Sequence, residues 1–520
     1  MVQAAARPRI DHHIGRWPVA SPRRFNQPTG HEIVDGHHGR RGLNRAELGN
    51  RSPGDGDHNA LAQAGSSYER CEPAPELADT KSFSGGRLGQ DTFAQPWGCE
   101  RFGVAVFKAR RKVGHKHNGT RVYAIQPAGR GGPVPPSPGY PTTNPQGITV
   151  NFAFNEEQEE LRKTTRKFLE GKSSEAAVRE QMDTEAGYDD GVWKQMGEQM
   201  GLQGLVIPEE FGGSGYGYIE LIVILEEMGR SLLCAPFFST VVLAGNTLIH
   251  SGDDQAKADL LPGIASGETI ATLAFTEANG RWDEAGITAT ATKDGDAFKL
   301  NGSKTYVIDG HTASLLIVAA RTDAGVSLFA VDGDAAGVTR TALSTMDQTR
   351  KQAKIDLADV SGRLIGTDGE GWSVLEKVLD LAAVALAAEQ VGGAQKCLEM
   401  AVEYAKDRVQ FGRPIGSFQA IKHKCADMLL EVESAKSAAY YAGWCASELN
   451  DELPSVASLA KAYCSEAYFH AAAENIQIHG GIGFTWEHPA HLYFKRAKSS
   501  ELLFGDPTYH RELLAQRIGI

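Results

Sequence analysis

The pattern of apolar and polar residues divides the chain near residue 151. Residues 155–170 place acidic side chains first and basic ones later, the order that the helix dipole favours. Residues 192–215 indicate a helix, a loop and a glycine-rich turn, and residues 219–233 repeat apolar side chains at helical spacing. We therefore predict an N-terminal helical domain over residues 151–269.

The next segment favours strands. Residues 287–308 alternate polar and apolar side chains and contain turn signals at Lys293–Asp296 and at Asn301–Gly302. We predict a β-domain over residues 270–366. Alanine-rich segments then continue to the end and predict a four-helix bundle over residues 367–520. Its first helix should bury four side chains along one side: Leu375, Val378, Leu379 and Val391. The predicted fold class is α+β, mostly α.

Residues 1–150 show no sustained hydrophobic period, are rich in glycine, proline, arginine and histidine, and end in a proline-rich run. They carry 20 Lys and Arg against 12 Asp and Glu, whereas residues 151–520 carry 33 against 53. We predict a disordered basic extension that buries too little apolar area to fold. Residues 101–125 offer a strand pair with a basic face, but we favour a solvated arm over nucleic-acid binding.

A further interpretation concerns the start of translation. Val150 precedes a segment that resembles a natural protein beginning, and valine is what an internal GTG start codon encodes when it is read through. We expect residues 1–149 to come from an over-extended gene model. A peptide from residues 1–140 in native protein would contradict this expectation.

The seven cysteines form no CxxC pair and no metal-ligand spacing, and they are typical of buried side chains in a reducing compartment. No apolar run approaches the ~20 residues of a membrane span, and the first residues lack a signal-peptide core. These features predict a cytoplasmic protein with no metal site and no membrane contact.

Four motifs carry a resemblance to a known family. They are LAFTEANGRWD (273–283), NGSKTYVIDG (301–310), RVQFGRPIGSFQAIKHKCADM (408–428) and IQIHGGIGFTWEHPAHLYFKRAK (476–498). In this order they resemble the L-x-x-T-E, G-x-K-x-W-I-T-N, R-x-x-F-G and Q-x-x-G-G motifs of acyl-CoA dehydrogenases. The resemblance covers residues 151–520. It implies the helical, β and helical-bundle domains of that family.

The resemblance also implies FAD as cofactor. Thr276 corresponds to the residue that offers donors to the flavin ring, and Arg408 to an arginine that reaches across a subunit interface to the FAD pyrophosphate. A guanidinium suits a pyrophosphate because it forks onto two oxygens. The implied FAD-binding residues are Phe275, Thr276, Tyr306, Arg408, Gln410, Phe411, Phe418, Gln419, Gln477, Gly480 and Gly481.

The family uses a glutamate to remove the α proton of an acyl-CoA thioester while hydride passes from Cβ to the flavin. The two positions at which it places this base correspond to Ala382 and Phe504, so neither holds a carboxylate here. Asp380, Glu389 and Glu501 are weak candidates for a displaced base, because a solvated or salt-bridged role suits each of them better. The catalytic residue therefore stays unknown.

The flavin-facing residues are altered as well. The family's Trp-Ile-Thr corresponds to Tyr306, Val307 and Ile308, and the serine of its Gly-Ser-Asp corresponds to Trp282. An isoleucine side chain has no donor for flavin N5, and a tryptophan would crowd a pyrophosphate. The residues implied to cross the interface are kept, so the two halves of the FAD site differ.

Three readings follow. The first is the base-lacking subunit of a heteromeric acyl-CoA dehydrogenase, which resembles actinobacterial heterotetramers of fatty acid or sterol side-chain oxidation. The second is a self-sufficient enzyme with a displaced carboxylate. The third is a non-catalytic acyl-CoA- or flavin-binding paralogue. The implied partners are an acyl-CoA substrate, a homologous subunit and an electron-transfer flavoprotein or similar acceptor.

Overall fold

The computed structural model describes residues 142–143, 149–150, 154–295 and 297–520. Thr142–Thr143 (β1) pairs antiparallel with Thr149–Val150 (β2). The rest of residues 1–150, including the proposed strand pair at 101–125, lies outside the described residues.

The first domain is helical, as predicted. The side chain of Asn155 accepts a hydrogen bond from the Gln158 amide, and the Gln158 side chain accepts one from the Asn155 amide, which fixes the first turn of α1. The elements are α1 (Glu156–Lys172), α2 (Glu175–Asp183), α3 (Asp190–Glu198), η1 (Glu209–Phe211), α4 (Tyr218–Arg230), the π-helical η2 (Phe238–Gly245), α5 (Asn246–His250) and α6 (Asp254–Ala265).

The middle segment forms a seven-stranded sheet with the order β3-β6-β4-β5-β9-β7, in which β8 pairs with β9 and β7 pairs back to β6. Most neighbours are antiparallel, but β3 and β4 pair in parallel with β6. The strands are β3 (Ala271–Ala274), β4 (Thr290–Asp294), β5 (Ala297–Ile308), β6 (Leu315–Arg321), β7 (Val326–Asp332), β8 (Val338–Ala342) and β9 (Gln352–Ile365).

One predicted turn was wrong. Asn301 and Gly302 lie inside β5, where the register with β9 shifts between Leu300 and Gly302. Gly302 has φ +142°, and a Cβ on it would lie 2.6 Å from the Ala289 Cβ. The glycine therefore permits a β-bulge and a close backbone approach, not a chain reversal. The other signal, at Lys293–Asp296, does fall at the junction of β4 and β5.

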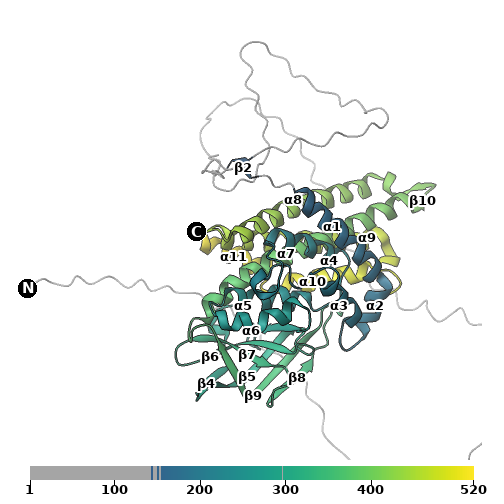
Figure 1. The fold of residues 1–520 in the computed structure, drawn as a ribbon. Coiled ribbons are helices and arrows are strands. Elements are labelled where there is room, and N and C mark those ends of the chain that lie inside the picture. Colours follow the sequence, from purple (N-terminus) through teal and green to yellow (C-terminus); the bar gives the residue numbers. More distant parts are fainter. Residues whose placement is uncertain (1–141, 144–148, 151–153, 296) are drawn as a thin grey trace, which may run out of the picture. The chain divides into compact units, whose positions relative to one another are not determined.

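The last segment is a helical bundle, as predicted. A short hairpin, β10 (Val409–Gln410) with β11 (Arg413–Pro414), and the turn η4 (Ile415–Ser417) join its first two helices. Figure 1 shows β10 at one end of the long helices and α11 at the other. The helices are α7 (Gly371–Asp407), α8 (Gln419–Glu448), α9 (Leu453–His479), α10 (Ala490–Leu502) and α11 (Pro507–Arg517), with η5 (Gly480–Phe484) after α9.

Three of the four side chains expected in the bundle core, Leu375, Val378 and Val391, are fully buried. Leu379 is only partly buried, because it lines a surface pocket described below. No helix among the described residues combines the length and the apolar composition of a membrane span.

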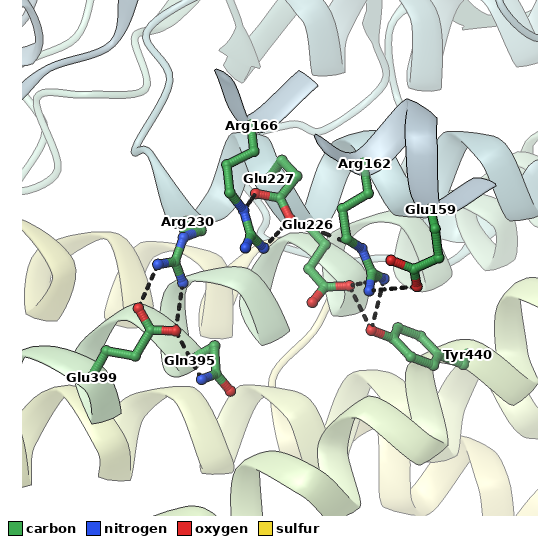
Figure 2. Close-up of polar contacts among 9 residues, drawn as sticks. All are labelled: Glu159, Arg162, Arg166, Glu226, Glu227, Arg230, Gln395, Glu399 and Tyr440. Carbon is green, nitrogen blue, oxygen red and sulfur yellow. Dashed lines mark hydrogen bonds and ion pairs between the residues drawn. The ribbon is translucent and has the colours of Figure 1, made fainter. Parts of the chain in front are cut away.

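Polar contacts join α1 to α4 of the same domain and to α8 of the bundle (Figure 2). Arg166 binds Glu227 of α4 with Nη2 and Oε1 2.6 Å apart, and Arg162 binds both Glu226 of α4 and Tyr440 of α8. Burial raises the pKa of Glu226, although Arg162 opposes that effect. Because a buried carboxylate needs such partners, the contacts of Glu226 with Arg162 and with Tyr440 fix α1 against α4 and join the first domain to α8 of the bundle.

Candidate active site and cofactor surface

A pocket of about 570 Å³ lies where the sheet meets the bundle. Its walls are the loop at residues 282–285, the first turns of α7, part of α11 and the side chain of Phe504. Trp282, Trp372 and Tyr509 supply aromatic surface, and Asp380 and Arg517 supply charge. This size and mixture are typical of small-molecule sites.

Four aromatic side chains form a continuous line beside this pocket. We call Phe238, Phe275, Trp282 and Phe504 the aromatic cluster. The ring of Phe504 stacks on Phe238 at 5.8 Å and meets the edge of Trp282 at 6.1 Å between centroids. Trp282 in turn packs on Phe275 at 5.8 Å. The cluster thus connects the motif that contains Thr276 with position 504, and rings in contact leave no room between them.

Asp380 is the candidate base that the structure brings to the pocket. It is buried, and its Oδ1 lies 2.8 Å from Nη1 of Arg517. Burial raises the pKa of Asp380 to about 6, which outweighs the lowering effect of Arg517. The carboxyl therefore titrates close to neutral pH at the pocket wall.

Phe504 lines the pocket, whereas Ala382, Glu389 and Glu501 lie outside its lining. Ala382 is fully buried in the core of α7. Glu389 is buried between two cations, with Arg350 in hydrogen-bond contact and Nη1 of Arg496 at 2.7 Å. Burial would raise the pKa of Glu389, but the two arginines outweigh it and the pKa is lowered. Glu501 binds Lys498 at 2.9 Å. Glu389 and Glu501 are thus already paired.

A second set of predicted residues lies at the opposite end of the bundle. The rings of Tyr404 and His479 stack at 4.2 Å, which places the end of α7 beside the end of α9. Phe411 is 92% exposed, and a Cβ on Gly480 or Gly481 would meet open space. We call this the cofactor surface, because the family resemblance implies that these residues bind FAD. It comprises Arg408, Gln410, Phe411, Phe418, Gln419, Gln477, Gly480 and Gly481, of which all but the half-buried Phe418 are exposed.

Family models of three acyl-CoA dehydrogenase domains match the chain between residues 155 and 519. The N-terminal domain matches residues 155–268, the middle domain residues 272–360 and the C-terminal domain residues 369–519. The chain belongs to the acyl-CoA dehydrogenase family. It is therefore a flavin-dependent oxidoreductase of the class that acts on a CH–CH bond.

Known members resemble this acyl-CoA dehydrogenase over most of their length. Acyl-CoA dehydrogenase IpdE2 of Mycolicibacterium smegmatis is 37% identical over 354 residues, which cover 68% of this chain and 96% of the relative. A variant of the Tcur3481–Tcur3483 steroid ACAD is 31% identical, with a TM-score of 0.64, over 70% of this chain and 98% of that one. The ChsE4–ChsE5 complex from Mycobacterium tuberculosis contains a chain that is 28% identical, with a TM-score of 0.66. The match covers 71% of this chain and 99% of that one.

The structure of this acyl-CoA dehydrogenase also shows a buried ion pair that sequence reasoning missed. Lys304 of β5 donates to Glu277 Oε1 at 2.6 Å, and the same oxygen accepts the amides of Thr288 and Ala289 at 2.9 Å. Burial lowers the pKa of Lys304 to about 8. The signal was present, because Glu277 and Lys304 both belong to family motifs. Their pairing holds the motif that contains Thr276 against β5.

The residues that are expected to face the flavin ring differ in exposure. Phe275 and Thr276 are buried at the end of β3, and the Thr305 amide donates to the Thr276 carbonyl at 2.9 Å. Tyr306 is 57% exposed, with φ +55°, whereas Ile308 is buried. The side chain at position 308 therefore offers only methyl groups to its surroundings.

The pocket and the cofactor surface are far apart. Asp380 lies in α7, and Arg408 follows the last residue of that helix, 28 residues later. At the rise of an α-helix this separation corresponds to about 42 Å. One dinucleotide is too short to contact both.

Proposed function

We propose that this chain is the base-lacking subunit of a heteromeric FAD-dependent acyl-CoA dehydrogenase. A homologous partner subunit supplies the carboxylate that removes the α proton of the acyl-CoA thioester. This chain supplies its cofactor surface to the partner's FAD. The FAD, when bound, provides the hydride acceptor.

The aromatic cluster is the observation that carries this proposal. Phe504 occupies one family base position, is buried, and is packed between Phe238 and Trp282. Trp282 occupies the position of the family serine. A thioester Cα needs a carboxylate within hydrogen-bond reach of its proton. An apolar side chain at position 504, closed in by two further rings, cannot meet that requirement.

The cofactor surface fits a phosphate-bearing group from a second subunit. Arg408 and Gln477 are exposed, and the backbone around Gly480 and Gly481 faces open space, so phosphate oxygens can approach backbone amides. The residues expected to face the flavin ring fit a flavin less well, since Trp282 and Ile308 occupy positions where the family has hydroxyl side chains. This asymmetry favours a chain that contributes to a neighbour's FAD.

The relatives support the same assembly. Two of the similar structures, Tcur3481–Tcur3483 and ChsE4–ChsE5, are described as pairs of chains, and the first is called a steroid ACAD. We extend this to a heterotetramer in the cytoplasm that acts on bulky acyl-CoA thioesters, such as fatty or sterol side-chain acyl groups. An electron-transfer flavoprotein is the proposed acceptor.

One observation favours a second candidate function. Asp380 is a pocket carboxyl whose pKa of about 6 lies in the range of a general base. A self-sufficient enzyme would use Asp380 in place of the family glutamate. Its ion pair with Arg517 opposes this role, because the pair turns the carboxylate towards α11.

The test is to purify the chain alone and with each homologous dehydrogenase encoded nearby, and to measure FAD per chain after gel filtration. The heteromer proposal predicts little FAD on the lone chain and stoichiometric FAD on one complex. Asp380→Asn, prepared in that complex, should retain activity. A loss of 10²-fold or more, the size expected for removal of a base, would favour the second candidate.

A further inference from the structure

The turn between α10 and α11 has a strained backbone. Phe504 has φ +60°, a conformation that aromatic residues rarely adopt, and Gly505 has φ +108°. A Cβ on Gly505 would lie 2.3 Å from Tyr509 Cδ1, so only glycine fits there. Strain of this kind persists where the surroundings fix the backbone, and it is concentrated at functional sites.

Lys461 of α9 is the side chain that fixes this turn. Its side chain is fully buried, and Nζ donates to the carbonyls of Glu501 and Gly505 and to Ser465 Oγ, each at 3.0 Å. No carboxylate among the described residues lies within ion-pair distance of this ammonium. Its two carbonyl partners stand on either side of Phe504. Burying a cation that has only carbonyl and hydroxyl partners costs free energy, and the presence of Lys461 here indicates a specific role.

We propose that Lys461 is a positioning residue that holds the α10–α11 turn and thereby keeps the Phe504 ring in the wall of the pocket. The inference goes beyond the proposed function, since it concerns the shape of this chain's own pocket in either catalytic reading. His510 of α11 completes the hold, with Nε2 3.1 Å from the Phe504 carbonyl.

The surroundings of Lys461 make the turn sensitive to pH. Glu501 of α10 and Asp506 of the turn attract the ammonium, Cys464 flanks it on α9, and His510 faces it from α11. Burial lowers the pKa of Lys461 to about 7, whereas burial lowers that of His510 to about 3. Above pH 7 the neutral amine loses the charge that strengthens its hydrogen bonds to the two turn carbonyls and has only two N–H donors for three acceptors, so its hold on the turn weakens.

Trp282 reports on this change because its indole lies against the Phe504 ring. The experiment is ¹⁹F NMR of the full chain labelled with 5-fluorotryptophan, with the Trp282 line assigned by its absence in Trp282→Phe. The expected result is a displacement of that line between pH 5.5 and 8.5 with a midpoint of about 7. In Lys461→Met the displacement is lost and the line lies at a new position.

Two controls separate Lys461 from its neighbours. Lys498→Met removes a lysine that binds the Glu501 carboxylate at the same helix end, and it should leave the displacement unchanged. Asp380→Asn removes a pocket carboxyl whose pKa of about 6 also lies in this window, and it too should leave a midpoint of about 7. A Trp282 line independent of pH in the wild-type chain overturns the proposal even if Lys461→Met fails to fold. So does a displacement that disappears in Asp380→Asn.

Discussion

The ring of Phe504 stacks on the ring of Phe238 with centroids 5.8 Å apart and planes 16° from parallel. Phe238 belongs to the π-helical η2, and the guanidinium of Arg350 lies 5.2 Å from its ring centroid. Position 504 is therefore supported from behind by a buried aromatic side chain that is itself in contact with a cation. A carboxylate placed there would lose water on one side and face an apolar ring on the other.

This packing predicts that the family glutamate cannot simply be restored. Phe504→Glu, like Ala382→Glu in the core of α7, should give no dehydrogenase activity in the lone chain and should lower its thermal midpoint. Each buries an unpaired carboxylate, and Ile308 still offers the flavin no donor. Dye-linked reduction with a panel of acyl-CoA thioesters measures the activity. Phe504→Leu is the control for lost ring packing, and turnover by either glutamate variant would contradict the prediction.

A second prediction concerns the cofactor surface. Arg408→Ala should weaken FAD retention by about 1.5–3 kcal/mol, since one charge-assisted phosphate contact is lost. That corresponds to roughly a 10- to 150-fold rise in the FAD dissociation constant of the complex. Flavin absorbance after gel filtration provides the measurement.

Arg511→Ala is the matched control, because Arg511 is a half-exposed arginine on α11 that binds Glu466 far from this surface. It should retain all its FAD. Equal flavin content in the Arg408 and Arg511 variants would remove Arg408 from the site.

A third prediction follows from Glu389. Glu389→Gln leaves Arg350 and Arg496 buried without their shared carboxylate, and should destabilise the chain by about 3–5 kcal/mol at pH 7. The folded-state pKa of Glu389 is lowered, so its stabilisation is present above the unfolded-state pKa of about 4.3 and is lost as pH falls through the folded value. The difference in unfolding free energy between the wild type and the Glu389→Gln variant should therefore become smaller below pH 4.

Urea unfolding at pH 7 and at lower pH measures that difference. Glu403→Gln, an exposed glutamate on the same helix, should shift the midpoint little. A Glu389 variant as stable as the wild type would mean that the two arginines find other partners.

The sequence predicted most of the fold because local signals and burial agree there. The acidic start of α1 and the apolar spacing of α4 each coincide with an observed helix. Asn301–Gly302 misled because the same dipeptide suits a hairpin turn and a bulge, and only the contact with Ala289 in three dimensions selects the bulge.

The candidate site was less accessible from sequence. The motifs identified Phe504 and Trp282 as substituted positions, but Phe238 belongs to no motif and its contact with Phe504 spans more than 260 residues of chain. The role of Lys461 was missed for the same reason, since its acceptors are backbone carbonyls, which every residue has. Long-range contacts of this kind follow from packing and carry no local pattern.

The central claim is that the base comes from another chain, and the most direct test is acyl-CoA turnover by reconstituted complexes. The account predicts no activity from this chain alone, activity with the right homologous partner, and a loss of roughly 10²–10⁴-fold when the partner's glutamate is changed to glutamine. Robust turnover by this chain alone, with one FAD per chain, would contradict the account and assign the base to Asp380.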